Sequence, residues 1–244
     1  MTERGRDSLV RDARHLAIGP SGARLEGGSL LIDIDELGAP WPRRVRGRVR
    51  LRPTLRIERS FVLDAAGRHR WWPVAPAARV EVELERPALR WSGDGYLDTN
   101  WGEAPLEDDF GEWSWSRAHQ EDATLVFYDC RPRIGPPRGL ALRFSNEDRC
   151  ETLLAPPVCE LPRSAWRVPR RTRADAGQRA VLREVLEDGP FYNRSVLEAR
   201  VQGREAFAVH EHLSLDRFRA RWVQYLLPFR MPRALRTRQP FEAL

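Results

Sequence analysis

The chain has 244 residues, of which 41% are hydrophobic, and its mean hydropathy is −0.56, values typical of a soluble globular protein with a core. No stretch reaches the ~18 apolar residues that a membrane-spanning helix needs, and the charged start TERGRDSLVRDAR is unlike a signal peptide. The three cysteines, Cys130, Cys150 and Cys159, have no CxxC spacing, which argues against a disulfide framework and a zinc site. We therefore expect an intracellular protein with reduced thiols.

All 41 basic residues are arginine, and the net charge is +6. This charge permits attraction to anionic membranes or to nucleic acid and does not choose between them. The length suits one large β domain or two smaller ones.

The first confident strand covers residues 29–34 and ends at turn residues that include Gly38 and Pro42. In residues 44–51 apolar side chains alternate with arginines, so this strand is predicted to have one buried face and one strongly basic face. The basic face is either a contact for an anionic surface or a solvated outer face, and we favour the solvated face.

Residues 54–63 and 68–73 are predicted to form a hairpin around the turn at residues 64–67. Within the second strand, His69 and Trp71 share one face and Trp72 lies on the other, because side chains alternate along a strand. Residues 79–85 alternate apolar and charged side chains and predict a further half-buried strand.

A Gly-Asp-Gly turn then opens the most unusual stretch of the chain, WSGDGYLDTNWGEAPLEDDFGEWSWSRA. In an extended strand Tyr96, Asp98 and Asn100 share one face, and the same alternation places Trp113 and Trp115 together further along. An acid, a tyrosine and two tryptophans that point into one space are an unusual composition for packing alone. Packing and a functional site both remain open on this pattern.

The β pattern continues towards the end of the chain, between loops rich in Gly, Pro, Asn and Asp. The expected strands are residues 123–129, 139–145, 164–168, 178–187, 192–201 and 205–212. Many short strands with a turn about every ten residues indicate an all-β barrel or sandwich.

The one convincing helix covers residues 214–227, with Ser214 as its cap and Pro228 as its stop. Its apolar side is predicted to consist of Leu215, Phe218, Trp222, Tyr225 and Leu226. We favour a helix that covers the end of a barrel over an interfacial membrane helix with basic flanks.

Several kinds of site find little support in the sequence. There is no glycine-rich phosphate loop and no nucleophile elbow. His210 and His212 share a strand face, but two histidines without a third spaced ligand are a weak metal signal, so we expect no metal. The aromatic residues cluster with an acid and not with the arginine-rich strand, which argues against single-stranded nucleic acid.

An acid, a histidine and aromatic rings without a cofactor can protonate an isolated alkene. A buried carboxyl group with a raised pKa supplies the proton, and tryptophan is the best π partner for the carbocation that results. On residue types alone, Asp98 is the general acid and Trp71 stabilises the cation. Tyr96 orients Asp98 or the water and His69 activates the water, although these last two roles are interchangeable.

Long blocks of the sequence resemble one family, the carotenoid 1,2-hydratases, also called hydroxyneurosporene synthases. The similarity covers nearly the whole chain and includes LAIGPS, DIDELGAPWPRRVRGRVRL, LDAAGRHRWWPVAPAARVEVELE, GDGYLDTNWGEAPLEDDF, LEDGPFYNRSVLEARV and HEHLSLDRF. The resemblance implies a hydratase that adds water, without a cofactor, across the terminal double bond of acyclic carotenes such as neurosporene and lycopene. It places the family's functional residues at His69, Trp71, Tyr96 and Asp98.

The resemblance also implies two lipocalin-like β-barrels, residues 1–104 and 105–244, of which the first is N-terminally incomplete. We expect substrate contacts from Trp72, Asn100, Trp113 and Trp115. Because carotenes dissolve in bilayers, we expect a peripheral protein on the cytoplasmic side of the inner membrane, in contact with lipid and not with nucleic acid. Residues 43–50 and 214–233 are the candidate contacts.

Two other functions remain open. A non-catalytic lipocalin-like carrier of carotenoids or lipids is the alternative, since such barrels hold small ligands and a fold does not determine chemistry. A cofactor-free cyclase that uses the same proton donor is a third. The ionisable pair His69 and Asp98 favours an enzyme, because a purely apolar carrier gains nothing from burying such groups.

Overall fold

The structure is a computed structural model that describes residues 4–38, 42–145, 147 and 149–227. The chain divides into two compact units. Unit 1 consists of Met1–Arg56, Ala77–Leu97 and Tyr225–Leu244, and unit 2 consists of Ile57–Pro76 and Asp98–Gln224. Both are built from antiparallel strands, which confirms the all-β fold predicted from the sequence.

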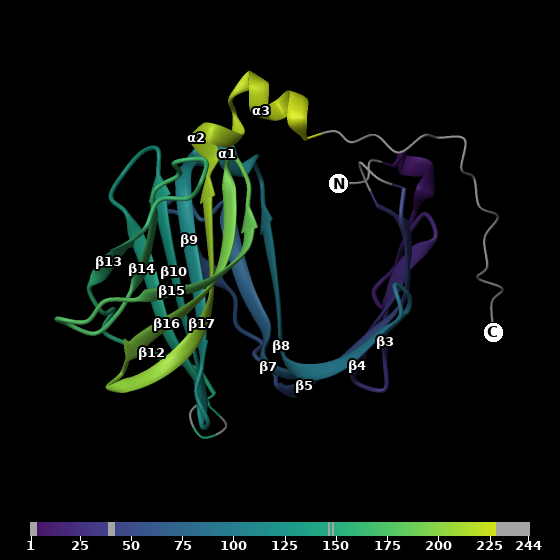
Figure 1. Ribbon diagram of the computed structural model, residues 1–244, viewed down its shortest axis with the longest axis horizontal. Coiled ribbons are helices and arrows are strands. Elements are labelled where there is room, and N and C mark those ends of the chain that lie inside the picture. Colours follow the sequence, from purple (N-terminus) through teal and green to yellow (C-terminus); the bar gives the residue numbers. More distant parts are fainter. Residues whose placement is uncertain (1–3, 39–41, 146, 148, 228–244) are drawn as a thin grey trace. The chain divides into compact units, whose positions relative to one another are not determined.

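Unit 1 is an antiparallel sheet in which β3, β4 and β5 lie side by side (Figure 1). After the short 3-10 helix η1 (Arg6–Ser8), its strands are β1 (Leu9–Arg11), β2 (His15–Ile18), β3 (Ser21–Glu26), β4 (Ser29–Leu37), β5 (Arg44–Leu55) and the first-unit parts of β7 (His69–Arg86) and β8 (Leu89–Gly102). The strands predicted at 68–73 and 79–85 therefore form one continuous strand, β7. β7 pairs with β5 through residues on both sides of the exposed Arg79. No turn therefore separates the two predicted strands.

The arginine-rich strand β5 has the alternating exposure that its sequence predicts. Its arginines lie beside carboxylates of neighbouring strands: Arg44 with Asp35, Arg46 with Glu85, Arg48 with Asp33 and Arg52 with Glu81. Ion pairs within the sheet therefore offset much of the positive charge of this face. This arrangement agrees with the solvated outer face that we favoured.

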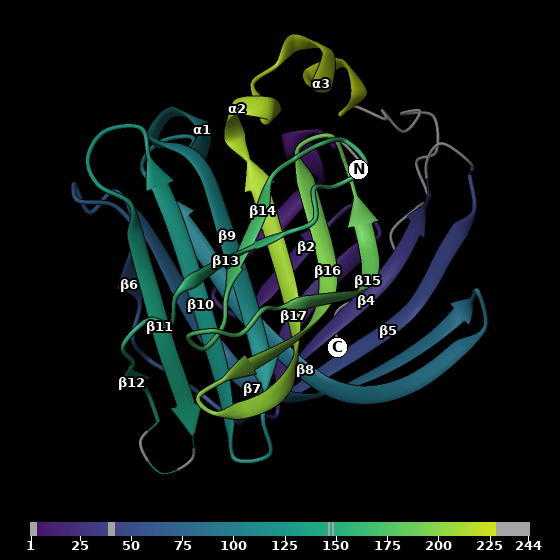
Figure 2. The same cartoon turned by 60° about the vertical axis from the view of Figure 1, so that its left-hand side comes forward.

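Unit 2 is built on a seven-stranded sheet in the order β12-β11-β10-β9-β17-β16-β15 (Figure 2). The bounds are β9 (Phe110–His119), β10 (Ala123–Pro132), β11 (Arg138–Ser145), β12 (Glu151–Thr152), β15 (Val181–Asp188), β16 (Tyr192–Val201) and β17 (Arg204–Ser214). One face of this sheet forms a hydrophobic core around Ala118, Leu125, Phe127, Leu197 and Ala208. Opposite this core, the strand β6 (Phe61–Val62) pairs with the start of β7.

A separate hairpin, β13 (Val158–Leu161) and β14 (Arg170–Arg173), lies over the core face of the sheet. The strand predicted at residues 164–168 is wrong. Ser164 accepts hydrogen bonds from the backbone of Arg167 and Val168, which forms a turn between β13 and β14. Val168 of this segment is buried although it lies in a loop, whereas Trp166 is exposed.

The single helix predicted at residues 214–227 is also wrong. β17 runs to Ser214, and two short helices follow, α2 (Leu215–Phe218) and α3 (Arg221–Leu226). Ser214 does cap α2, because its Oγ accepts a hydrogen bond from the backbone N–H of Arg217. The interruption turns α3, so Val223 is buried whereas Trp222 and Tyr225 are exposed. Pro228 lies outside the described residues.

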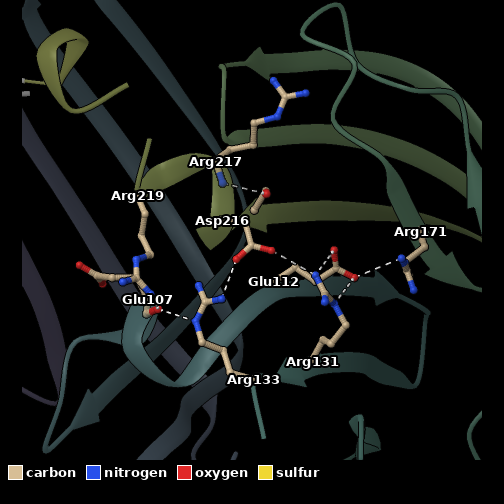
Figure 3. Close-up of polar contacts among 9 residues, drawn as sticks. Glu107, Glu112, Arg131, Arg133, Arg171, Asp216, Arg217 and Arg219 are labelled. Atoms are coloured by element: carbon tan, nitrogen blue, oxygen red, sulfur yellow. Dashed lines mark hydrogen bonds and ion pairs between the residues drawn. The ribbon is translucent and has the colours of Figure 1, made fainter. Parts of the chain in front are cut away.

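Polar contacts hold α2 against the end of the unit 2 sheet (Figure 3). Asp216 pairs with Arg131 of β10 and with Arg133, which directly follows that strand. Glu112 of β9 pairs with Arg131 and with Arg171 of β14. The short helix α1 (Leu106–Asp109) joins this network through the carbonyl of Glu107, which accepts hydrogen bonds from Arg133 and Arg219. These contacts connect α2 and Arg219 to α1 and to the end of the sheet.

Candidate functional site

The centre of the candidate site is a hydrogen bond between two residues that the sequence singled out. The indole N–H of Trp71 donates to Oδ2 of Asp98 at 2.7 Å. Trp71 is completely buried and Asp98 is half-buried. The carboxyl group is thus held at one defined position by a donor that water does not reach.

Aromatic rings surround Trp71. The ring of Tyr128 stacks on it with a centroid distance of 5.3 Å and an interplanar angle of 11°, and Phe61 makes a tilted contact at 5.6 Å. Trp113 packs against Tyr128 in turn, at 5.9 Å. Offset stacks of this kind stabilise aromatic clusters beyond the area they bury.

Strand pairing explains why these rings meet. Phe61 of β6 lies directly opposite Trp71 of β7, and Tyr128 of β10 lies directly opposite Trp115 of β9. Because side chains alternate, Trp113 and Trp115 point to the face of the sheet that carries Tyr128, away from the core around Ala118. Two local hairpins therefore provide the rings.

His69 makes a different contact from the one expected of a residue that activates water. Its Nε2 lies 2.5 Å from Oδ2 of Asp109, and its ring packs edge-on against Phe110 at 5.1 Å. The carboxylate of Asp109 also pairs with Arg68. His69 is almost fully buried and its backbone N–H donates to Asp64 at 2.8 Å, so both its backbone and its ring are fixed.

Gly102 allows this arrangement. A Cβ atom at this position would collide with Nδ1 of His69. The end of β8 can therefore pass the imidazole only without a side chain. The glycine of the TNWG motif thus has a structural reason next to the candidate site.

The remaining candidates are distributed as follows. Trp72 points away from Trp71, as alternation predicts, and its indole N–H donates to the carbonyl of Ile57. Asn100 is exposed, and its Oδ1 lies 3.5 Å from the hydroxyl of Tyr128. Trp115 is buried beside Tyr128. Tyr96 is half-buried in the part of β8 that belongs to unit 1, whereas Asp98 belongs to unit 2.

Burial determines the protonation of the groups next to Trp71. It raises the pKa of Tyr128 well above the usual value, with further contributions from the charges of Cys130, Asp98 and Glu211. Burial also raises the pKa of the Cys130 thiol to about 12. Both groups are therefore neutral at physiological pH, and Cys130 is unreactive as a nucleophile.

A small cavity of about 190 Å³ lies beside this cluster in unit 2. Tyr128 and Cys130 line it together with Leu63, Leu140 and Val62. A larger hollow of about 860 Å³ lies in unit 1 and is lined by charged residues such as Asp33, Arg46, Arg48 and Glu83. The smaller cavity is the one next to the predicted site residues, and Arg138 also lines it.

Two residues of this site were missed by sequence reasoning, Tyr128 and Asp109. Tyr128 sits in the run ATLVFYDC, which reads as an ordinary buried strand. Asp109 sits in the acidic segment LEDDF, where three carboxylates look equivalent. Only strand pairing and the position of α1 distinguish them, so no local signal could have found them.

His210 and His212 do share a face of β17, as predicted, and both are fully buried. They point to the core side of the sheet, where Nε2 of His210 donates to the carbonyl of Arg171 at 2.9 Å. Within the described residues, no group of three or more His, Cys, Asp or Glu side chains is arranged to hold a metal ion. No helix among the described residues has the length and apolar character needed to cross a bilayer.

The fold and the site define an all-β protein in which a carboxyl group is held against a buried aromatic cluster. The chain belongs to the carotenoid hydratase CrtC family, whose model matches residues 1–240. The family resemblance stated from the sequence motifs is therefore confirmed.

Relatives and a solved structure support this assignment. The chain is 52% identical over 234 residues to the acyclic carotenoid 1,2-hydratase of Thiocapsa roseopersicina, covering 96% of this chain and 58% of that protein. It is 39% identical to the enzyme of the same name from Cereibacter sphaeroides, covering 96% of this chain and 84% of that protein. The crystal structure of CghA with Sch210972 matches with a TM-score of 0.54 at 12% identity, over 86% of this chain and 70% of that one, and shows a shared fold.

Proposed function

We propose that this chain carries the hydratase chemistry of its family, the cofactor-independent addition of water across the terminal C1–C2 double bond of acyclic carotenes such as neurosporene and lycopene. The observation that carries the proposal is the hydrogen bond from the buried Trp71 indole to the Asp98 carboxyl group. Relatives that match nearly the whole of this chain are named acyclic carotenoid 1,2-hydratases.

The proposed reaction has two steps. The protonated carboxyl group of Asp98 gives its proton to C2 of the alkene, which leaves a tertiary carbocation at C1. A water oxygen then forms a bond to C1, and the proton it loses returns to the Asp98 carboxylate. The sum is one water added, with the acid regenerated and no oxidation or reduction.

The contacts of Trp71 favour a role for its N–H group. One side of the indole stacks on Tyr128, and Phe61 contacts it as well, so its ring is occupied by neighbouring side chains. A carboxyl group retains an acceptor oxygen for the indole N–H whether or not it is protonated. We therefore propose that Trp71 positions Asp98, in addition to the contribution of its ring to cation stabilisation that the sequence suggested.

The pair of His69 and Asp109 holds the loop before β9 next to β7. A histidine whose ring nitrogen is bound by a carboxylate is held in one orientation. We propose that His69 acts as an oriented group near the site and that Tyr96 shares the task of ordering the attacking water. The buried indole N–H of Trp113 has no hydrogen-bond partner among the described residues and is a further donor for water.

A peripheral contact with a membrane completes the proposal, because the substrates dissolve in lipid. Its support lies near α3, where Trp222 is exposed and stacks with the exposed Trp166 at 6.0 Å. Tryptophan favours the interface between water and lipid, and Arg217 and Arg221 would add attraction to anionic headgroups. Residues 228–233 of the predicted contact lie outside the described residues, and the arginines of residues 43–50 are weaker candidates because most pair with carboxylates.

The experiment that tests the proposal is an incubation of the purified protein with lycopene or neurosporene in detergent or vesicles. We expect a product heavier by one water that carries a tertiary hydroxyl group. The alternative is a non-catalytic carrier of carotenoids or lipids. Tight carotene binding without any gain of water would favour the carrier.

A further inference from the structure

The core side of unit 2 changes from apolar to polar towards one end of its sheet. Strand register places Ser116, His210 and Ser195 in one row across β9, β17 and β16. The next row, towards the end of the sheet, is Ser114, His212 and Asn193. All six are at most 6% exposed, whereas the row on the other side of Ser116 is Ala118, Ala208 and Leu197. A polar patch this large inside a core needs hydrogen-bond partners.

The strand β14 supplies some of them. The carbonyl of Arg171 accepts hydrogen bonds from Oγ of Ser114 at 2.6 Å and from Nε2 of His210 at 2.9 Å. The hydroxyl of Thr172 lies 3.4 Å from that of Ser116. This half of the patch is therefore satisfied by the protein itself.

The other half of the patch lacks hydrogen-bond partners in the part of the chain that the structure describes. Both ring nitrogens of His212, Nδ1 of His210 and Oδ1 of Asn193 are buried without a hydrogen-bond partner among the described residues. Burial, with a contribution from the charge of Arg170, lowers the pKa of each histidine to about 4, so both rings are neutral at physiological pH. His212 therefore has one donor and one acceptor that no described group satisfies.

Arg170 places a positive charge near these two histidines. Its side chain is 2% exposed, donates to the carbonyl of Pro162 at 2.8 Å and lies 3.4 Å from Oγ of Ser195. No carboxylate of the described residues lies within ion-pair distance of it. Asp188 is the acid that acts on Arg170 at longer range, and it already accepts hydrogen bonds from Asn193 and from the backbone of Ala165.

A guanidinium group has five N–H donors, and the described contacts occupy only two of them. Buried arginines are rare unless an anion accompanies them, because an unpaired charge is costly to remove from water. The surrounding groups, Ser195, Thr172 and His212, can also donate. The patch thus has an excess of donors and one positive charge, and it lacks an acceptor that carries negative charge.

We propose that the polar end of the unit 2 core is a binding site for a small carboxylate, held by the fork of Arg170 with Ser195 and His212 as further donors. Two parallel N–H groups of a guanidinium match the two oxygens of a carboxylate. The site lies on the opposite face of β9 from Trp113 and Trp115, since Ser114 and Ser116 alternate with them along the strand. It is therefore separate from the candidate acid site and independent of the proposed function.

The test is a titration of the full chain with sodium formate at pH 7.5, followed by calorimetry and by thermal unfolding, with sodium chloride at equal ionic strength as the reference. Binding to the native state raises the unfolding temperature in a saturable way. We expect the unfolding temperature to rise to a plateau with formate, and we expect no such rise in Arg170→Gln. In Ser195→Ala the dissociation constant for formate should rise on the order of tenfold, because charge-assisted hydrogen bonds are strong. Arg163→Gln, which removes an exposed arginine, and Asp98→Asn should both bind formate like the unchanged protein.

Three results would overturn the proposal. Formate could act no differently from chloride, or Arg170→Gln could keep the full response. Saturation by inorganic phosphate without any response to formate would contradict the assignment to a carboxylate. Should Arg170→Gln fail to fold, Ser195→Ala and His212→Leu decide the matter, and unchanged formate binding in both would contradict the site.

Discussion

The indole N–H of Trp71 donates to Oδ2 of Asp98 at 2.7 Å, across 27 positions of the chain. A tryptophan that is stacked on Tyr128 and completely buried has little freedom to move, so it holds the carboxyl group in one place. The proposed hydratase needs this order, because proton transfer to carbon requires the acid at a fixed distance from the alkene.

The first prediction concerns Trp71. Trp71→Phe keeps an aromatic ring in the stack and removes the N–H donor, so turnover should fall on the order of tenfold or more, as for a lost hydrogen bond to an acid. Trp71→Leu removes the ring as well and should lose more. Steady-state turnover of lycopene, with carotene binding measured alongside, separates the two effects. Unchanged turnover in Trp71→Phe would show that the hydrogen bond to Asp98 has no part in the reaction.

The second prediction concerns Asp109. Asp109→Asn removes the charge that pairs with both His69 and Arg68, and we expect the free energy of unfolding to fall by about 1–3 kcal/mol. Asp108→Asn is a matched control, because Asp108 is the exposed neighbour in the same short helix. Urea unfolding of both variants makes the comparison. Equal stability of the two variants would mean that the His69–Asp109 contact does not stabilise the fold.

The third prediction is a pH dependence of stability. His210 and His212 have their pKa values lowered from 6.5 to about 4, mainly by burial. As pH falls below 6.5, these histidines bind protons in the unfolded chain but stay neutral in the folded protein. The free energy of unfolding therefore decreases down to about pH 4. Each histidine contributes on the order of 3 kcal/mol to this decrease.

Urea unfolding between pH 7.5 and 4.5 measures the effect. His212→Gln should flatten the profile, whereas His119→Gln, at an exposed position on β9, should leave it unchanged. A profile of the same steepness in all three proteins would contradict the assignment of this acid sensitivity to the buried histidines.

The fourth prediction concerns the membrane contact. Replacing Arg217, Arg219 and Arg221 with Gln should weaken binding to anionic vesicles on the order of tenfold or more, and the binding should decrease with salt. Arg219 also contacts the carbonyl of Glu107, so the fold of this variant is checked by circular dichroism. A triple replacement of the exposed Arg179, Arg183 and Arg200 on the β15–β16 side is the control. Binding to neutral vesicles that does not change with salt concentration would indicate a hydrophobic anchor. Trp166 and Trp222 are the candidates for such an anchor.

Much of the fold could be predicted because apolar and polar residues alternate along many of the strands in the sequence. β11 and β16 have nearly the predicted bounds, and Trp71 and Trp72 lie on opposite sides of β7 as expected. The prediction of a single helix failed because the apolar spacing of residues 214–227 does not reveal the interruption between α2 and α3.

The candidate site was predicted in part for the same reason. Asp98 and Trp71 follow from residue type and spacing, and they do meet. Tyr128 and Asp109 could not be found, because the strand register and the α1 turn that bring them to Trp71 and His69 depend on contacts far apart in the sequence. The predicted division of the chain at residues 104 and 105 stays a prediction.

The most direct test of the central claim follows the proton that Asp98 is proposed to deliver. Lycopene is incubated with the protein in D₂O, and the product is examined by mass spectrometry and NMR after exchange of the hydroxyl group in H₂O. The account predicts one non-exchangeable deuterium at C2 for each water added, and a rate at least on the order of 10²-fold lower for Asp98→Asn with carotene binding retained. Hydration by Asp98→Asn within a few-fold of the unchanged protein, or a product without deuterium at C2, would contradict it.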